Sequence, residues 1–291
     1  MTELTFNKVS LSYLNQPALK KVSFSLKENT ICGLLGRNGS GKTSLMSLIA
    51  SYRPATKGDI SYNGEALFDN PQAMPNIAFV HNTADDNENP RIKKLFKRAA
   101  LFRPNWDNEY AYALLEERKL SATDKIMNLS QGEAATVHSI IGLADRCPIT
   151  LYDEAYSGMD AAVRTWFIQE ILEDYLRHPR MIIFSTHFIG EVEHILGEVL
   201  VLDKGKLLYH ESVDDLRAKG SSVIGDTSAI DALVQTHDLR PLSSKSLGSQ
   251  KEIILFEHLP TCVQTEAQEK GLTLSHPSLQ ELFVHITDQQ G

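Results

Sequence analysis

An apolar run that ends in a glycine-rich loop and leads directly into a helix-like segment is the feature that most constrains this chain. The run is TICGLLG and the helix-like segment is KTSLMSLIASY. Residues 36–43, from the last glycine of the run to the start of the helix-like segment, fit the pattern G-x-x-x-x-G-K-[ST]. Glycines let such a loop curl until successive N–H groups point inward, and the N-terminal end of the following helix adds positive potential. The pattern therefore predicts a phosphate-binding loop between a buried strand and a helix.

The loop predicts specific contacts to a nucleotide. We expect these consecutive residues to surround its phosphates: Gly36, Arg37, Asn38, Gly39, Ser40, Gly41, Lys42, Thr43 and Ser44. Lys42 is expected to reach the β- and γ-phosphates, and the Thr43 hydroxyl to ligate Mg²⁺. ATP and Mg²⁺ are therefore the expected ligands.

Strand-like and helix-like segments alternate along most of the chain. ITLYDE and MIIFSTH are apolar runs separated by the helix-like AAVRTWFIQEILEDYL, and residues 4–35 contain further strand-like segments. This order predicts an α/β fold with a mostly parallel sheet that helices cover on both faces. GDISYNGEAL carries an Asn-Gly hairpin signal, and the polar, helical segment from about 83 to 148 predicts an inserted helical subdomain.

A boundary is expected near residue 220, which divides the chain into domains of residues 1–220 and 221–291. The second domain shows the order strand, helix, strand, strand, helix, strand, which resembles the α+β, ferredoxin-like unit. A last helix, PSLQELFVHIT, begins with a Ser278–Glu281 capping box. This domain could dimerise, regulate or brace the first one, and we expect dimer contacts.

An Asp-Glu pair follows the apolar run ITLY. The strand would deliver Asp153 to its carboxyl end, beside the phosphate loop, where it can hold Mg²⁺. Glu154, one residue farther along, is suited to accept a proton from an attacking water molecule.

With these motifs the first 220 residues resemble the ABC ATPase family, a phosphate-loop NTPase class with an antiparallel β subdomain and a helical subdomain. Further elements fall in the family's order. Ser130, Gln131, Gly132 and Glu133 resemble the ABC signature, Ser157 and Asp160 the D-loop, and His187 the switch histidine. Tyr13 matches the aromatic residue that stacks on adenine, although it could instead be a core or rim aromatic.

Some positions depart from the family pattern. Asn82 stands where the family has the Q-loop glutamine, a further candidate Mg²⁺ ligand, and its side chain is one methylene shorter. The signature carries Gln131 and Glu133 in place of the usual glycine and glutamine. Because Ser130 and Gly132 remain, the resemblance implies an active ATPase.

The resemblance also implies partners. In the family, the signature of one chain closes over the ATP held by another, which implies a dimer with a second copy or a homologous ATPase. A groove within residues 82–105 would receive a helix of a separate, multi-helix membrane permease. Phe96, Leu101 and Phe102 could line that groove or could be core residues.

Composition excludes other classes of protein. With 29 basic and 37 acidic residues, a net charge of −8 argues against general nucleic-acid binding. No stretch approaches the roughly 20 apolar residues of a membrane-spanning helix, and the polar N-terminus is not a signal peptide. Isolated cysteines indicate reduced core thiols. We expect a cytoplasmic protein, peripheral on the inner face of the cell membrane.

The whole pattern resembles ATPases of bacterial exporters, including those of antimicrobial peptides and phenol-soluble modulins. The predicted function is therefore ATP hydrolysis that drives a permease, with export favoured over import. A soluble, non-transport ABC ATPase and a regulatory ATP-binding protein are the alternatives.

Overall fold

The computed structural model describes residues 3–14, 16–81 and 89–288. The chain forms two compact units, Met1–His210 and Glu211–Gly291. The division falls before the boundary that the sequence placed near residue 220, because helix α7 (Val213–Ala218) contacts helix α10 (Leu279–Asp288) of the second unit.

The first unit contains an antiparallel sheet near the N-terminus. Its strands lie in the order β2-β1-β4-β5, with bounds β1 Glu3–Tyr13, β2 Gln16–Lys27, β4 Lys57–Tyr62 and β5 Glu65–Ala66. Alternate residues of β1, such as Leu4 and Phe6, are buried, as a strand with one solvent-facing side requires. The Asn-Gly pair at 63 and 64 forms the predicted β4–β5 turn.

A second sheet of six strands carries the site. Its order is β10-β9-β3-β8-β7-β6, with bounds β3 Ile31–Gly36, β6 Ile77–His81, β7 Ile149–Asp153, β8 Met181–Ser185, β9 Glu198–Asp203 and β10 Lys206–Ser212. The pairs β9–β3, β3–β8, β8–β7 and β7–β6 are parallel. Every residue of β3, β7 and β8 is buried, which explains their mostly apolar sequences.

The parallel register brings distant parts of the chain to one edge of this sheet. Asp153 at the end of β7 pairs with His81 of β6 on one side and with Ser185 of β8 on the other. Strand β3 ends at Gly36, where the phosphate loop begins. The loop and the Asp-Glu pair are therefore brought together by strand pairing.

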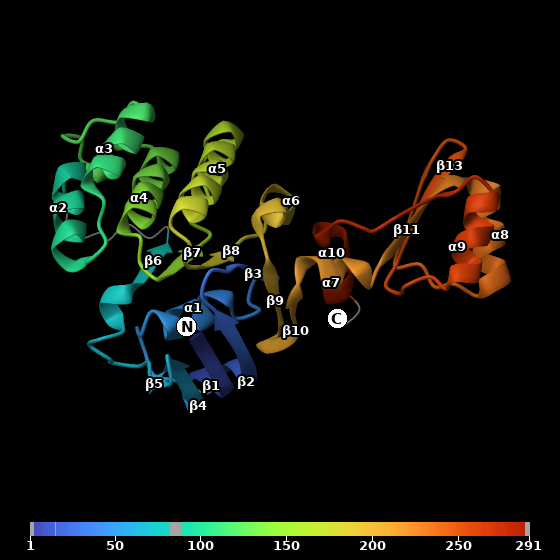
Figure 1. Cartoon of the computed structure of the whole chain (residues 1–291), viewed down its shortest axis with the longest axis horizontal. Helices are drawn as coiled ribbons and strands as arrows, with labels where there is room; N and C mark the ends of the chain where they lie inside the picture. Colours follow the sequence, from blue (N-terminus) through green and yellow to red (C-terminus); the bar gives the residue numbers. More distant parts are fainter. Residues whose placement is uncertain (1–2, 15, 82–88, 289–291) are drawn as a thin grey trace. The chain divides into compact units, whose positions relative to one another are not determined.

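Helices complete the first unit. Their bounds are α1 Lys42–Ile49, α2 Ile92–Phe102, α3 Asn108–Glu117, α4 Gln131–Asp145, α5 Ala161–Arg177 and α6 Ile189–Val192, with 3₁₀ turns at Met74–Asn76, Ile126–Asn128 and Glu193–Ile195. Helices α2, α3 and α4 contact one another and form the green group in Figure 1. They fall within the segment that the sequence assigned to a helical subdomain.

An ion-pair network joins α4 to its neighbours. Arg146, just after α4, contacts Asp107 at 2.6 Å and Asp174 of α5 at 3.1 Å. Asp174 is almost fully buried and also pairs with Arg180. Because removing one partner would leave a buried charge uncompensated, this network holds the end of α4 in place.

The second unit has the topology expected for its sequence. Its elements are β11 Ser221–Asp226, α8 Thr227–His237, β12 Ser243–Leu247, β13 Gln250–Leu255, α9 Thr261–Glu269 and β14 Thr273–Ser275. The strand order is β12-β13-β11-β14 with antiparallel pairing throughout, as in a ferredoxin-like unit. At α10 the predicted capping box forms, since Ser278 Oγ accepts from the Glu281 amide and the Ser278 amide donates to Glu281 Oε2.

Across the described parts of both units, no helix combines the length and apolar character needed to cross a membrane.

Candidate nucleotide site

The phosphate loop takes the conformation that its glycines permit. Gly41 has φ of 109°, and a Cβ there would lie 2.8 Å from the carbonyl oxygen of Ala18, so a side chain is excluded on both grounds. Gly41 is also the N-cap of α1, and no side chain of the described residues caps this helix end. The first amides of α1 have no intrahelical partner, so they can donate to an anion.

Lys42 lies over the loop that precedes it. Its side chain is nearly buried, and its Nζ donates to the carbonyl oxygens of Gly36 at 2.8 Å and of Arg37 at 3.4 Å. Burial lowers the pKa of Lys42, and the nearby carboxylates of Glu154 and Asp153 oppose that shift. The ammonium group is therefore held at the mouth of the loop and close to both carboxylates.

Asp153 offers an oxygen ligand at the end of β7. Within the described residues its Oδ1 is buried and has no hydrogen-bond partner. Asp153 lines one cavity of about 410 Å³ together with Thr43, Tyr13 and Glu154. A carboxylate and a hydroxyl oxygen facing one cavity fit the preference of Mg²⁺ for oxygen ligands.

Glu154 adopts a backbone conformation that non-glycine residues rarely take. Its φ is 47°, in the left-handed region, and its amide donates to the carbonyl oxygen of Ser185 at 3.1 Å. Such a residue carries strain of about 1–3 kcal/mol, which is characteristic of functional sites. The conformation turns the chain sharply after β7 and leaves the Glu154 carboxylate partly exposed beside Asp153.

His187 lies beside Glu154. Its Nδ1 is 3.8 Å from Glu154 Oε1, and both side chains are partly exposed. The preceding residue, Thr186, accepts a hydrogen bond from the Phe188 amide at 2.8 Å. The sequence placed both residues at one reaction centre, and the structure brings them together.

Tyr13 is a rim residue of the same cavity and not part of the core. It is 38% exposed, and its hydroxyl donates to Ser44 Oγ at 3.2 Å. The guanidinium carbon of Arg53 lies 4.7 Å from the centre of its ring, a cation–π contact. Stacking of adenine on Tyr13 remains a prediction.

Sequence reasoning missed Tyr52, Arg53 and His81, which also line this cavity. Tyr52 and Arg53 follow α1 in a segment without a motif, so no local signal marked them. In the sequence His81 is notable only as the residue before Asn82, and only the pairing of β6 with β7 puts it opposite Asp153. Asn82 itself lies outside the described residues.

Ser130 caps helix α4. Its Oγ accepts from the Glu133 amide at 3.3 Å, and its own amide donates to Glu133 Oε2 at 2.8 Å. The Ser130 hydroxyl also donates to Glu133 Oε2. Hydrogen bonds from the Ser130 amide and hydroxyl lower the pKa of Glu133. The unusual glutamate of the signature thus completes a capping box.

The signature packs against the segment that the sequence assigned to the D-loop. A Cβ on Gly132 would lie 2.8 Å from the carbonyl oxygen of Gly158, so only glycine allows this approach. Gln131 lies against Gly158, and Asp160 caps α5 by accepting from the Val163 amide at 2.9 Å. Ser157, by contrast, donates its amide to the carbonyl oxygen of Glu154.

Some of the candidate residues line one or the other of two cavities. Tyr13, Thr43, Asp153 and Glu154 line one cavity. A different cavity, of about 430 Å³, contains the signature residues Ser130, Gln131, Gly132 and Glu133 together with Asp160. The two cavities share no residue among those described. Within one chain, the signature therefore does not line the cavity of the phosphate loop.

A glycine-bounded loop at a helix N-terminus, beside an Asp-Glu pair at the carboxyl edge of a parallel sheet, defines a phosphate-loop nucleotide-binding protein. Comparisons with known proteins narrow this class, because residues 19–157 match the model of the ABC transporter family. Residues 19–157 therefore correspond to an ABC transporter ATP-binding domain, the ATPase domain of that family.

Individual relatives agree with this assignment. The ABC transporter ATP-binding protein YtrB of Bacillus subtilis is 27% identical, with 68% of each chain covered. The phosphonates import ATP-binding protein PhnC of Trichormus variabilis is 26% identical over 71% of this chain and 90% of its own. The linearmycin resistance ATP-binding protein LnrL of Bacillus subtilis is 24% identical, with 98% of each chain covered.

Solved structures show the same fold. The structure of an ATP-binding subunit of an ABC transporter matches with a TM-score of 0.66 at 24% identity, and covers 74% of this chain and 91% of that one.

Proposed function

We propose that this protein hydrolyses ATP at a site completed by two chains and thereby drives a separate membrane permease. The observation that carries the proposal is the separation of the signature cavity from the phosphate-loop cavity. A second chain would bring its signature to the phosphate loop, so we expect a head-to-tail dimer with a second copy or a homologous ATPase. In that dimer, Lys42 and Ser130 of opposite chains contact the γ-phosphate of ATP.

The chemistry of hydrolysis falls to residues at the carboxyl edge of the sheet. Thr43 and Asp153, with Asn82 as a third candidate, hold Mg²⁺, which when bound neutralises phosphate charge. Glu154 accepts the proton of the attacking water, and His187 stabilises charge that develops on the γ-phosphate. Tyr13 stacks on adenine, while Ser157 and Asp160 extend the contact between chains.

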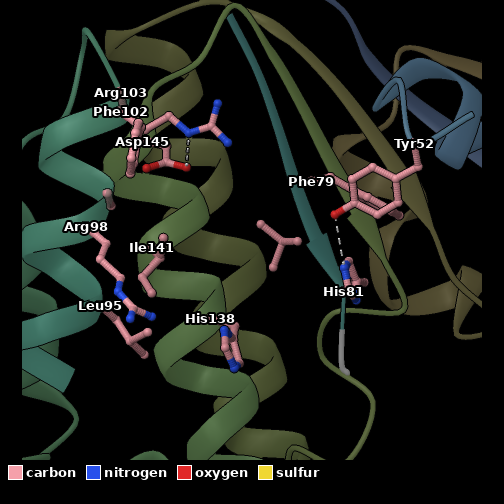
Figure 2. A pocket seen from close by; sticks show the side chains of 12 residues that line it. Tyr52, Phe79, His81, Leu95, Arg98, Phe102, Arg103, His138, Ile141 and Asp145 are labelled. Carbon is pink, nitrogen blue, oxygen red and sulfur yellow. Dashed lines mark hydrogen bonds and ion pairs between the residues drawn. The ribbon is translucent and has the colours of Figure 1, made fainter. Parts of the chain in front are cut away.

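A groove beside the nucleotide cavity is the proposed docking site for the permease. It has a volume of about 570 Å³ and lies between α2, α4 and β6 (Figure 2). Phe102 lines it and is 69% exposed, whereas Phe96 is buried against Trp106 and Tyr112. Of the two phenylalanines that the sequence offered as groove residues, Phe96 is thus a core residue and Phe102 is available to a partner.

Three residues connect the groove to the nucleotide cavity. Tyr52, Phe79 and His81 line both. Their rings are in contact, with centroids 5.4 Å apart for Tyr52 and Phe79 and 4.8 Å apart for Phe79 and His81. A shared, packed wall gives a short route by which a change at the nucleotide reaches a helix docked in the groove.

Export is the direction that we propose, with peptides or other amphipathic compounds as cargo. The support is the extent of two matches. The match to the linearmycin resistance protein covers 98% of this chain and so includes the second unit, whereas the match to the phosphonate import protein covers 71%. The protein then acts in the cytoplasm on the inner face of the cell membrane, and the second unit supplies dimer contacts.

The docking proposal predicts that Phe102→Asp lowers the membrane-bound fraction of the protein by about 10-fold, because burying a phenylalanine is worth about 1.5–3 kcal/mol. The measurement is the amount of tagged chain that sediments with membranes of cells expressing its permease. ATP hydrolysis by the purified variant should be unchanged, since Phe102 does not line the nucleotide cavity.

Leu176→Asp is the matched control, because Leu176 is 70% exposed on α5 and lines neither cavity. The docking site is wrong if the Phe102 variant sediments as well as the control. A wild-type chain that never sediments with membranes would remove the transport function itself.

A further inference from the structure

Arg164, in the first turn of α5, contacts the two segments that flank the candidate reaction centre. Its Nε and Nη2 donate to the two carboxylate oxygens of Glu191 in α6, each at 2.9 Å. This is the bidentate arrangement in which a planar guanidinium holds a carboxylate in one orientation. Helix α5 is thereby fixed to the segment that follows His187.

The third nitrogen of the same guanidinium contacts the D-loop segment. Arg164 Nη1 donates to the carbonyl oxygen of Met159 at 3.0 Å. Met159 is almost fully buried, and its neighbour Gly158 is the residue against which Gly132 of the signature packs. Arg164 therefore also fixes the backbone that supports the signature.

The face of the guanidinium completes the connection to His187. The Arg164 Cζ lies 4.5 Å from the centre of the Phe188 ring, and the Phe188 and His187 ring centroids are 4.0 Å apart. His187 in turn lies 3.8 Å from Glu154. A continuous series of contacts thus runs from Met159 through Arg164 and Phe188 to the proposed catalytic pair.

A second set of contacts supports the loop that carries His187 and Phe188. The Tyr156 hydroxyl is hydrogen-bonded to Thr186 Oγ1, which accepts from the Phe188 amide. This contact orients the backbone before Phe188, and the Tyr156 ring also packs against the Phe188 ring, with centroids 6.0 Å apart. Loss of the Arg164 contacts should therefore leave the loop folded, while Phe188 and His187 lose the support of the guanidinium on the side of α5.

The Arg164–Glu191 pair differs from an ordinary surface ion pair on the same helix. Side-chain exposures are 18% for Arg164 and 34% for Glu191, against 68% and 59% for the pair of Arg177 with Glu173. The Arg177 pair has one contact, at 3.2 Å, and links two residues of one helix. Exposed pairs of that kind contribute little, whereas Arg164 joins three segments.

We propose that Arg164 is a positioning residue for ATP hydrolysis. Through its contacts with Glu191 and Phe188 it holds His187 in a fixed position relative to the D-loop segment. The inference rests on the proposed function of His187 and Glu154 at the reaction centre. Arg164 does not line the nucleotide cavity, so it acts on the rate of hydrolysis and not on the binding of ATP.

Steady-state ATP hydrolysis by the full chain tests this inference with Arg164→Lys, Glu191→Gln and the control Arg177→Lys. We expect each of the first two to lower kcat by about 30-fold or more, since a small displacement of a catalytic group can cost about 100-fold. KM for ATP should stay within about twofold of the wild-type value, because these substitutions do not change contacts that bind ATP equally in the ground state and the transition state. The double variant Arg164→Lys/Glu191→Gln should hydrolyse ATP no more slowly than the slower single variant, because both substitutions break the same contact.

Two results would overturn the inference while wild-type turnover is intact. One is a kcat for Arg164→Lys within about twofold of the Arg177→Lys control. The other is a loss of activity that matches the fraction of unfolded protein in a thermal melt at the assay temperature. If wild-type protein itself does not hydrolyse ATP, the proposed function fails first and the role of Arg164 fails with it.

Discussion

Replacement of Glu154 by glutamine should leave ATP binding intact and slow hydrolysis by about 10²–10⁴-fold, the usual contribution of a general base. Glutamine keeps the shape of the side chain but cannot accept the proton of the attacking water. If ATP then persists at the proposed interface between two chains, the variant should also accumulate as an ATP-bound dimer.

The geometry of Glu154 supports so large an effect. Its strained backbone, with φ of 47°, brings the carboxylate to the cavity that Thr43 and Asp153 line. A single-turnover assay with size-exclusion chromatography measures both consequences. Glu173→Gln, on the exposed surface of α5, is the control and should match wild type. Undiminished turnover in the Glu154 variant would remove this residue as the base.

The second large effect is expected for Lys42→Ala, which should weaken ATP binding by about 30-fold or more, because loss of the ammonium that pairs with the phosphates costs about 2–5 kcal/mol. The Lys42 ammonium is nearly buried over the loop, beside the carboxylates of Asp153 and Glu154. Without its charge, those carboxylates would repel the phosphates. Titration with a fluorescent ATP analogue measures the affinity directly.

The variant should still fold, because in the described part of the chain the hydrogen bonds of the Lys42 ammonium go to the carbonyl oxygens of Gly36 and Arg37, at the surface of the loop and not in the core. A thermal melt checks this point. Lys57→Ala, at an exposed position of β4, provides the control. Affinity that is retained after removal of Lys42 contradicts the assignment of the phosphate loop.

The sequence predicted well what depends on burial and on local hydrogen bonding. Strands β3, β7 and β8 are buried throughout, so they appear in the sequence as mostly apolar runs. The predicted capping box at Ser278 follows from residue types three positions apart, and the box at Ser130, which was not predicted, has the same spacing. These features need no knowledge of the rest of the molecule.

Contacts between distant segments were not predictable in the same way. Arg164 and Glu191 are 27 positions apart, and no periodicity connects them. Arg53 reaches Tyr13 only because the segment after α1 returns to β1. The resemblance implied that the signature serves a second chain, and the structure adds that its residues line a cavity of their own.

A mixing experiment tests the two-chain site most directly. Lys42→Ala and Gly132→Asp are each expected to be inactive, since one lacks the phosphate contact and the other the glycine that lets the signature approach Gly158. In a mixed dimer, the loop of the Gly132 variant meets the signature of the Lys42 variant, and one site is intact. An equal mixture should therefore regain about a quarter of wild-type activity, if chains pair at random and sites act independently. Activity that stays at the sum of the two separate variants, in protein that forms mixed dimers, would contradict a site shared between chains.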